Sequence, residues 1–209
     1  GLFLAALAAV RHVAPRAGTP AILMPNPFYP AYGAGARAAG CEAVYLPTTP
    51  TNGFLPDLDS LDDATLARTV AIYIASPANP QGSVASADYY ARLKSLADRF
   101  GFLIFSDECY SEIYTQAAPG SALAVAGPDF KNVVAFQSLS KRSNLPGLRV
   151  GFAAGDADFL HAYHELRNVA APQVPVPALE AQPELVSLVG GMRSRRWPAR
   201  AAGPTRRAS

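Results

Sequence analysis

The segment of this chain best suited to chemistry is Ser-Leu-Ser-Lys at 138–141, in which two serines precede a lysine. It directly follows an apolar run at 133–136, and the end of a buried strand is a rigid place to hold a reactive amine. A partly buried lysine beside other cations has a lowered pKa and becomes a nucleophile toward carbonyls. Arg149 follows eight residues later, and a guanidinium with two hydroxyls is suited to bind phosphate. These groups together suit pyridoxal phosphate, which bears both an aldehyde and a phosphate. The alternative is a solvated lysine in a Ser/Gly/Pro turn, since short motifs are hypotheses.

Polar and aromatic side chains follow three further apolar runs in the same way. They are Asn79 after 70–75, Asp107 and Tyr110 after 102–105, and Phe28 and Tyr29 after 21–24. Each has an ordinary interpretation alone, because Asn-Pro is a common turn, an aspartate can cap a helix and a Phe-Tyr pair can belong to the core. Ligands of parallel sheets bind beyond the carboxyl ends of the strands. We therefore expect these side chains to surround one crevice with the lysine and the arginine.

The alternation of apolar runs with helical patterns predicts the fold. Expected strands are Ala21–Met24, Ala43–Leu46, Val70–Ala75, Phe102–Ser106, Val133–Phe136 and Val150–Ala153. Expected helices are Leu2–Val13, Tyr29–Ala39, Ser60–Thr69, Ala85–Phe100 and Ala157–Asn168. Because the apolar runs are nearly continuous, we expect a three-layer α/β fold, in which a mainly parallel sheet has helices on both faces.

The composition of the chain indicates which partners, metals and cellular locations to expect. Half of the 209 residues are hydrophobic and the net charge is +2, which favours no particular partner. Two cysteines provide neither a disulfide framework nor a metal site, and His161 and His164 fit a solvated helix better than a metal pair. No apolar run reaches transmembrane length, and the Leu/Ala-rich start fits a buried helix better than a signal peptide. We expect a cytoplasmic protein without metal, membrane or nucleic-acid partners.

Three motifs, in this order and spacing, resemble those of class I and II pyridoxal-phosphate-dependent aminotransferases, which share the fold of aspartate aminotransferase. They are Ser76-x-x-Asn79-Pro80-x-Gly82, Asp107-Glu108-x-Tyr110 and Ser138-x-Ser140-Lys141-x7-Arg149-x-Gly151. The resemblance covers about residues 1–177 and implies the large domain of the fold type I transferases. Within it, the segments 106–114 and 138–149 are most similar to succinyldiaminopimelate aminotransferases of lysine biosynthesis.

The resemblance also implies a role for each site residue. Lys141 would form a Schiff base with the cofactor aldehyde and later carry a proton between the substrate α-carbon and the cofactor. Asp107 would pair with the pyridine nitrogen and keep it protonated. The remaining cofactor contacts would be Asn79 and Tyr110 to the phenolic oxygen, Ser138, Ser140 and Arg149 to the phosphate, and Tyr29 stacked on the ring, with Phe28 as its rival.

The division of the chain that we expect is an incomplete cofactor-binding large domain at 1–171 and an irregular Pro/Arg-rich tail at 172–209. The family's N-terminal segment and its phosphate-binding Gly-Thr turn would precede Gly1. The tail stands where the small domain and its carboxylate-binding arginine would follow. It is typical of a frameshifted or artificial end, with a natural disordered tail as the alternative. Losing that arginine alone would cost about 1.5–3 kcal/mol, so we expect little turnover from this chain alone.

The function implied is transfer of an amino group between an amino acid and a 2-oxo acid, with succinyldiaminopimelate and 2-oxoglutarate as the pair that the finer similarity suggests. The full-length protein would be a homodimer. Two alternatives stay open, a carbon–sulfur β-lyase on the same fold and a catalytically dead remnant or scaffold. Cofactor binding separates the enzymes from the remnant, and a keto-acid product formed with glutamate consumption separates the transaminase from the lyase.

Overall fold

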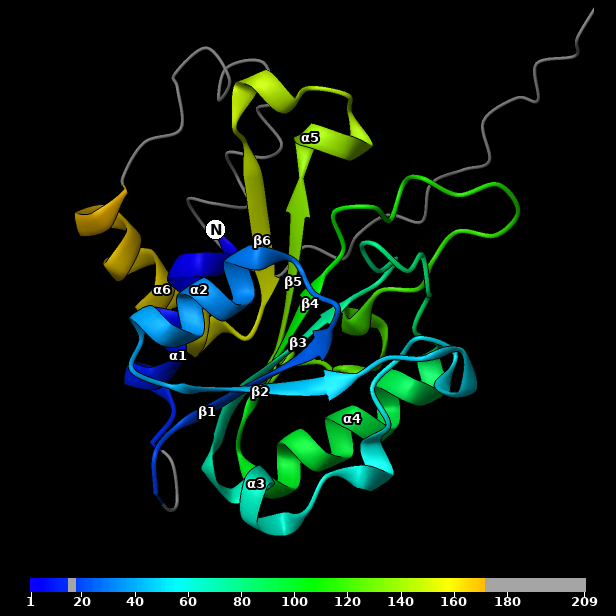
Figure 1. Cartoon of the computed structure of the whole chain (residues 1–209). Coiled ribbons are helices and arrows are strands. Elements are labelled where there is room, and N and C mark those ends of the chain that lie inside the picture. The colour runs from blue at the N-terminus through cyan, green and yellow to red at the C-terminus, as the bar shows by residue number, and fades with distance from the viewer. Residues whose placement is uncertain (15–17, 172–209) are drawn as a thin grey trace, which may run out of the picture.

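One mixed, mostly parallel sheet of six strands forms the centre of the molecule in the computed structural model, which describes residues 1–14 and 18–171 (Figure 1). The strand order is β2-β1-β3-β4-β5-β6, and only β6 runs antiparallel to its neighbour. The strands are β1 Ala21–Asn26, β2 Glu42–Pro47, β3 Thr69–Ala75, β4 Leu103–Asp107, β5 Val133–Ser138 and β6 Gly151–Gly155. The sheet confirms the predicted fold class, and the predicted tail lies outside the described residues.

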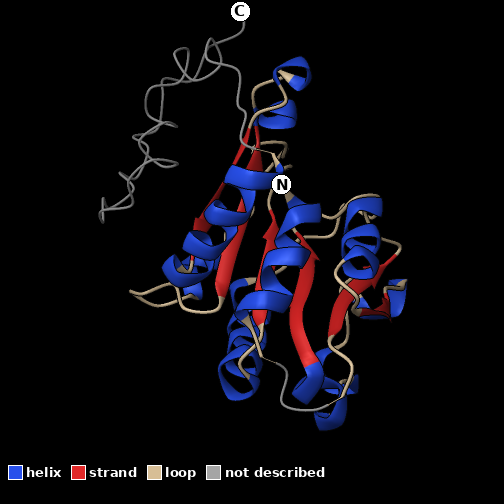
Figure 2. Cartoon of the chain, turned by 90° about the vertical axis from the view of Figure 1, so that its left-hand side faces the viewer, coloured by secondary structure: helices blue, strands red, loops and turns tan. Residues whose placement is uncertain are grey.

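Helices cover both faces of this sheet, so the fold has three layers (Figure 2). One face packs against α1 Leu2–His12, α2 Pro30–Ala38 and α6 Ala157–Ala170. The other packs chiefly against α3 Asp63–Arg68 and α4 Ala87–Phe100. No helix within the described ranges is long and apolar enough to cross a membrane.

Alternate residues of each strand supply the two apolar cores, because successive side chains point to opposite faces of a strand. In β4, for example, Leu103 and Phe105 enter the core beneath α1, whereas Ile104 enters the core beneath α4. The α1-side core contains a run of stacked rings, in which Tyr73 lies 4.3 Å from Tyr32 and 5.2 Å from Phe105, centroid to centroid. This packing fixes α2 against the middle of the sheet.

Capping side chains explain where two helices begin later than expected. The side chain of Asp62 accepts a hydrogen bond from the Thr65 amide at 2.7 Å, so α3 starts at Asp63, after a short 3₁₀ turn at Leu58–Ser60. Ser86 caps α4 in the same way. Such caps satisfy amides that the first helical turn leaves unpaired.

Gly155 is the position where we expect a substitution to disturb the sheet most. Its φ is +143°, and a Cβ atom built there would lie 2.0 Å from the Val133 carbonyl oxygen, which is backbone and cannot move aside. We expect Gly155→Ala to lower the free energy of unfolding by about 2–3 kcal/mol. Urea denaturation measures the change. Gly120→Ala, whose Cβ would meet nothing within 4 Å, is the control, and equal stability of the two variants would contradict the expectation.

Candidate active site

The predicted site residues gather at one edge of the sheet, where the parallel strands end. Asp107 is the last residue of β4 and Ser138 the last of β5, and these two strands are parallel neighbours. Although β6 is antiparallel, its first residue, Gly151, pairs with Ser138. Arg149 therefore reaches the same edge through the turn that precedes β6. The short helix α5, Leu139–Arg142, lies beyond the tips of β5 and β6 (Figure 1).

Asp107 is a nearly buried carboxylate, 8% exposed, with two neutral donors. Its Oδ2 accepts a hydrogen bond from the Tyr32 hydroxyl at 2.5 Å, and its Oδ1 accepts one from the Cys109 amide at 3.2 Å. No lysine or arginine in residues 1–14 and 18–171 forms an ion pair with it. A carboxylate has about four acceptor positions, so Asp107 can accept a further charged donor. A protonated ring nitrogen, as in pyridoxal phosphate, fits this environment.

Tyr32 contacts Asp107 and is not among the residues predicted for the site. Its side chain is 1% exposed and donates to Asp107 from α2, 75 residues away in the chain. Burial, and then the negative charge of Asp107, raise the pKa of Tyr32 well above 10, so the hydroxyl keeps its proton and remains a donor. The spacing to Tyr29, three residues before it at the start of a helix, was the available signal, because such residues share one helix face.

Phe28 and Tyr29, which the sequence could not separate as ring-stacking residues, point to different neighbours. Phe28 stacks on Tyr45 of β2, with ring centroids 5.3 Å apart and the ring planes at 24°. Tyr29 meets the ring of Tyr32 edge-on at 5.8 Å and is 46% exposed. The exposed ring of Tyr29 thus lies beside the residue that binds Asp107.

Lys141 lies in α5, directly after β5. The hydroxyl of Ser138 accepts a hydrogen bond from the Ser140 amide at 3.2 Å and caps this one-turn helix. Leu139 anchors the turn, because its side chain is buried and its amide donates to the Val150 carbonyl at 3.0 Å. The side chain of Lys141 is exposed, and its Nζ lies 5.7 Å from the centre of the Tyr110 ring. The structure thus brings the amine and the phenol of the two motifs together.

Arg149 meets Ser140 in the same turn. Its Nη1 donates to the Pro146 carbonyl at 2.8 Å and lies 3.5 Å from the Ser140 hydroxyl oxygen. Its backbone is left-handed, with φ 54° and ψ 37°, which costs a residue with a side chain about 1–2 kcal/mol. Strained backbone of this kind is concentrated at functional sites. Ser140 and Arg149 form the hydroxyl–guanidinium pair that the sequence analysis assigned to phosphate.

Asn79 is exposed at the tip of the loop after β3, where the structure shows no hydrogen bond to its side chain among the described residues. The loop is held by its neighbour Gln81, whose Nε2 donates to the Pro27 carbonyl at 2.9 Å and to the Thr48 hydroxyl at 3.0 Å. Because Pro27 belongs to the segment that carries Tyr29, Gln81 connects the two loops.

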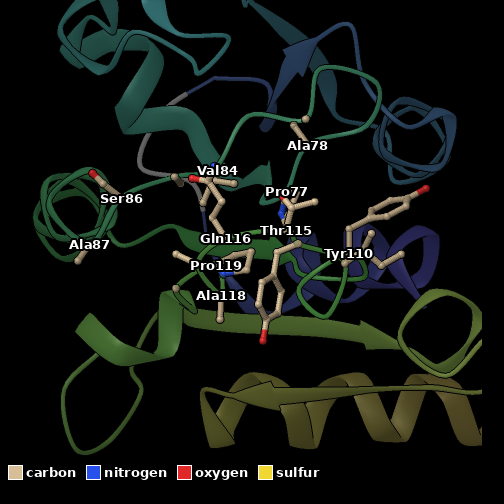
Figure 3. Close-up of a pocket in the computed structure, with 16 residues that line it drawn as sticks. Pro77, Ala78, Val84, Ser86, Ala87, Tyr110, Thr115, Gln116, Ala118 and Pro119 are labelled. Atoms are coloured by element: carbon tan, nitrogen blue, oxygen red, sulfur yellow. The ribbon is translucent and has the colours of Figure 1, made fainter. Parts of the chain in front are cut away.

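A pocket of about 680 Å³ opens between the loop after β3 and the segment 110–120 after β4. Tyr110 lies at one end of it, near Pro77 and Ala78 (Figure 3). Its lining does not include Asp107, Lys141 or Arg149. Of the proposed site residues, only Tyr110 therefore lines this pocket.

Buried tyrosines make the stability of this fold sensitive to alkaline pH. Burial is the main cause that raises the pKa of Tyr32, Tyr73 and Tyr90 above 10 in the folded chain. In the unfolded chain, the pKa of tyrosine is about 10. Their contribution to the free energy of unfolding is complete below about pH 10 and is lost as pH rises above it. We expect urea midpoints to fall above pH 10, and to fall less steeply in Tyr73→Phe. Equal slopes for the two proteins would contradict this origin.

Known proteins are similar to most of this chain. The sequence profile of the family described as "Aminotransferase class I and II" matches residues 2–186. An LL-diaminopimelate aminotransferase of Desulforudis audaxviator is 39% identical over 148 residues, which are 70% of this chain and 38% of that protein. The enzyme of the same name from Aquifex aeolicus is 39% identical over 141 residues, which are 66% of this chain and 36% of that protein. The chain thus spans less than two fifths of the length of these relatives.

Solved structures show the same fold. A crystal structure of an aminotransferase from Neisseria meningitidis has a TM-score of 0.77 and 37% identity, covering 85% of this chain and 46% of that one. A probable N-succinyldiaminopimelate aminotransferase from Thermus thermophilus has a TM-score of 0.72 and 28% identity, covering 88% of this chain and 50% of that one. The match over most of the chain, the sheet and the three motifs lead to one conclusion: the chain belongs to the class I and II aminotransferases.

Proposed function

We propose that residues 1–171 form a domain that binds pyridoxal 5'-phosphate and supplies the cofactor side of amino transfer between an amino acid and a 2-oxo acid. The observation that carries the proposal is Asp107, a nearly buried carboxylate with acceptor capacity left over. It ends the strand next to the one that leads into Lys141. When bound, the cofactor would provide an electron sink for the bond broken at the substrate α-carbon.

Each side chain then has a specific task. Asp107 would hold a proton on the ring nitrogen, and Tyr32 orients that carboxylate by its hydrogen bond. The amine of Lys141 would hold the cofactor aldehyde and, when free, would accept and return the proton of the substrate α-carbon. The other proposed contacts are Asn79 and Tyr110 to the phenolic oxygen, Ser138, Ser140 and Arg149 to the phosphate, and Tyr29 to the ring face.

The substrate proposal rests on the names of the relatives. Several are called LL-diaminopimelate aminotransferases, and one similar structure is called a probable N-succinyldiaminopimelate aminotransferase. We propose a diaminopimelate-type amino donor, free or N-succinylated, and 2-oxoglutarate as the acceptor. We also propose that the protein acts as a homodimer, as the resemblance to this family implied.

A single-turnover experiment tests the amino-transfer proposal. The chain is loaded with pyridoxal phosphate and is then mixed with an excess of one amino donor, which is glutamate, LL-diaminopimelate or its N-succinyl derivative. Although we expect little turnover from this chain alone, one half-reaction followed to its end should replace the absorbance of the lysine-bound cofactor by that of pyridoxamine phosphate and release one equivalent of 2-oxo acid per site. Cystathionine distinguishes the β-lyase alternative, because a lyase would release pyruvate and ammonia and keep the aldehyde form of the cofactor. Absorbance that no amino donor changes would contradict the proposal.

Tyr32→Phe tests the proposed support of Asp107. The substitution removes one hydrogen bond to a buried carboxylate while keeping the ring, so we expect affinity for pyridoxal phosphate to fall about tenfold. Tyr73→Phe is the matched control, because the Tyr73 hydroxyl donates to the Leu2 carbonyl at 2.8 Å and not to Asp107. Fluorescence titration gives both affinities, and equal losses in the two variants would contradict a role through Asp107.

A further inference from the structure

Glu108, the residue next to Asp107, is a buried carboxylate that makes all its hydrogen bonds inside the protein. It is 2% exposed. Its Oε1 accepts from the hydroxyls of Ser106 and Ser121, at 3.0 and 2.9 Å, and from the Ala122 amide at 2.9 Å. Its Oε2 accepts from Nε2 of Gln137 at 3.2 Å. Glu108 thus accepts hydrogen bonds from four neutral donors, which leaves little capacity for a ligand. Asp107 accepts from only two donors.

These bonds connect the two strand ends that carry the proposed chemistry. Gln137 is the penultimate residue of β5, four residues before Lys141. The backbone amide of Glu108 also donates to the Phe136 carbonyl at 2.9 Å, so the link to β5 is made by main chain and side chain together. The Ser111 hydroxyl lies 3.3 Å from Oε1 of Gln137, which fixes the orientation of that amide.

Burial makes this network sensitive to the loss of any one member. Desolvation raises the pKa of Glu108, and the hydrogen bonds from Ala122, Ser121, Ser106 and Gln137 oppose that rise. A buried polar network that is fully satisfied holds one geometry, and a partly satisfied one is costly. The contact between Glu108 and Gln137 is therefore a specific connection rather than a replaceable surface contact.

We infer that Glu108 is a positioning residue, which holds the end of β5 through Gln137 and so places Lys141 relative to Asp107. The inference rests on the proposed function, because it assigns the two strand ends to one cofactor. Glu108 itself touches neither cofactor nor substrate. Its effect on the chemistry passes through the turn that begins at Ser138.

Exchanging the two partners tests the connection. Gln137→Glu places a second carboxylate against Glu108, and like charges at this distance repel. The double variant Glu108→Gln, Gln137→Glu restores one amide and one carboxylate with their places swapped. Gln116→Glu is the matched control, because it adds the same charge at an exposed position in the nearby loop. Gln137→Leu removes the amide without adding charge and serves if the acidic variant fails to fold.

The first measurement is amide hydrogen exchange of the cofactor-free chain. The Leu139 amide, bonded to Val150, reports on the turn that carries Lys141, and the Ile104 amide, bonded to Asn132, reports on the sheet. We expect exchange at Leu139 to become about tenfold faster in Gln137→Glu, to recover in the double variant and to stay unchanged in Gln116→Glu. Exchange at Ile104 should not change. An exchange rate at Leu139 that does not change in Gln137→Glu, or that does not recover in the double variant, would overturn the inference.

The second measurement separates positioning of Lys141 from a general weakening of the site. Pyridoxal phosphate can bond covalently to Lys141, whereas pyridoxamine phosphate has no aldehyde and binds only reversibly. We expect Gln137→Glu to reduce affinity for pyridoxal phosphate about tenfold more than affinity for pyridoxamine phosphate. Equal losses for both forms would overturn the inference. A native chain that binds neither form would contradict the proposed function, and the exchange result would still decide the role of Glu108.

Discussion

Lys141→Ala is expected to abolish covalent attachment of pyridoxal phosphate to this chain. The substitution removes the amine that condenses with the aldehyde, and with it the water-eliminating step that forms the carbon–nitrogen double bond. Phosphate contacts from Ser138, Ser140 and Arg149 would remain, so the cofactor should still bind reversibly. Absorbance after gel filtration measures the attached fraction.

The other two lysines provide the control for this prediction. Lys94 pairs with Asp98 along α4, and Lys131 lies in the loop before β5. Neither follows the end of β5, so Lys94→Ala and Lys131→Ala should keep the absorbance of the lysine-bound cofactor. Retention of that absorbance in Lys141→Ala, or its loss in either control, would contradict the assignment of Lys141.

Asp107→Asn has the second largest expected effect, a loss of about 100-fold in affinity for pyridoxal phosphate. An asparagine keeps the shape and still accepts from Tyr32, but it carries no charge to balance a protonated ring nitrogen. Breaking a buried charge pair costs about 3 kcal/mol, which is about two decades in a dissociation constant. Fluorescence titration measures the affinity.

Asp88→Asn, an exposed position in α4, is the matched control for Asp107→Asn and should bind the cofactor as the native chain does. A second readout checks the proposed cause. If Asp107 acts by keeping the ring nitrogen protonated, an analogue with carbon in place of that nitrogen should bind the native chain and Asp107→Asn about equally. A loss that persists with this analogue would point to a general disturbance of the site.

The sheet could be predicted from the sequence because its strands are nearly continuous apolar runs. All six strands were located, with ends that differ by one or two residues. The run at 21–24, for instance, extends to Asn26 through Pro25, a residue that usually marks the end of a strand. The four-residue helix α5 was not predicted, because a single turn is too short to show helical periodicity.

The positions of residues that directly follow strands could be predicted from the sequence. Contacts between segments far apart in the sequence could not. The positions of Asp107 and Lys141 follow from the parallel strands that precede them. The spacing from Tyr29 indicates only that Tyr32 shares a helix face with it, whereas the contact of Tyr32 with Asp107 depends on how α2 packs on the sheet. Phe28 and Tyr29 are adjacent, so only their different neighbours, Tyr45 and Tyr32, distinguish them.

The hydrogen bonds around Glu108 could not be predicted from the sequence for a related reason. Its partners come from three segments, and a glutamate following an aspartate has no distinctive pattern in the sequence. Buried carboxylates can only be recognised once their donors are placed, because burial and hydrogen bonding decide whether such a group is structural or chemical.

Borohydride reduction of the native chain with pyridoxal phosphate, followed by peptide mapping, identifies the amine that binds the cofactor. Reduction makes the bond between cofactor and lysine permanent, so the labelled peptide identifies the amine without depending on turnover. We expect one equivalent of label on Lys141. Label distributed over Lys94 and Lys131, with Lys141 unmodified, would contradict the proposed site.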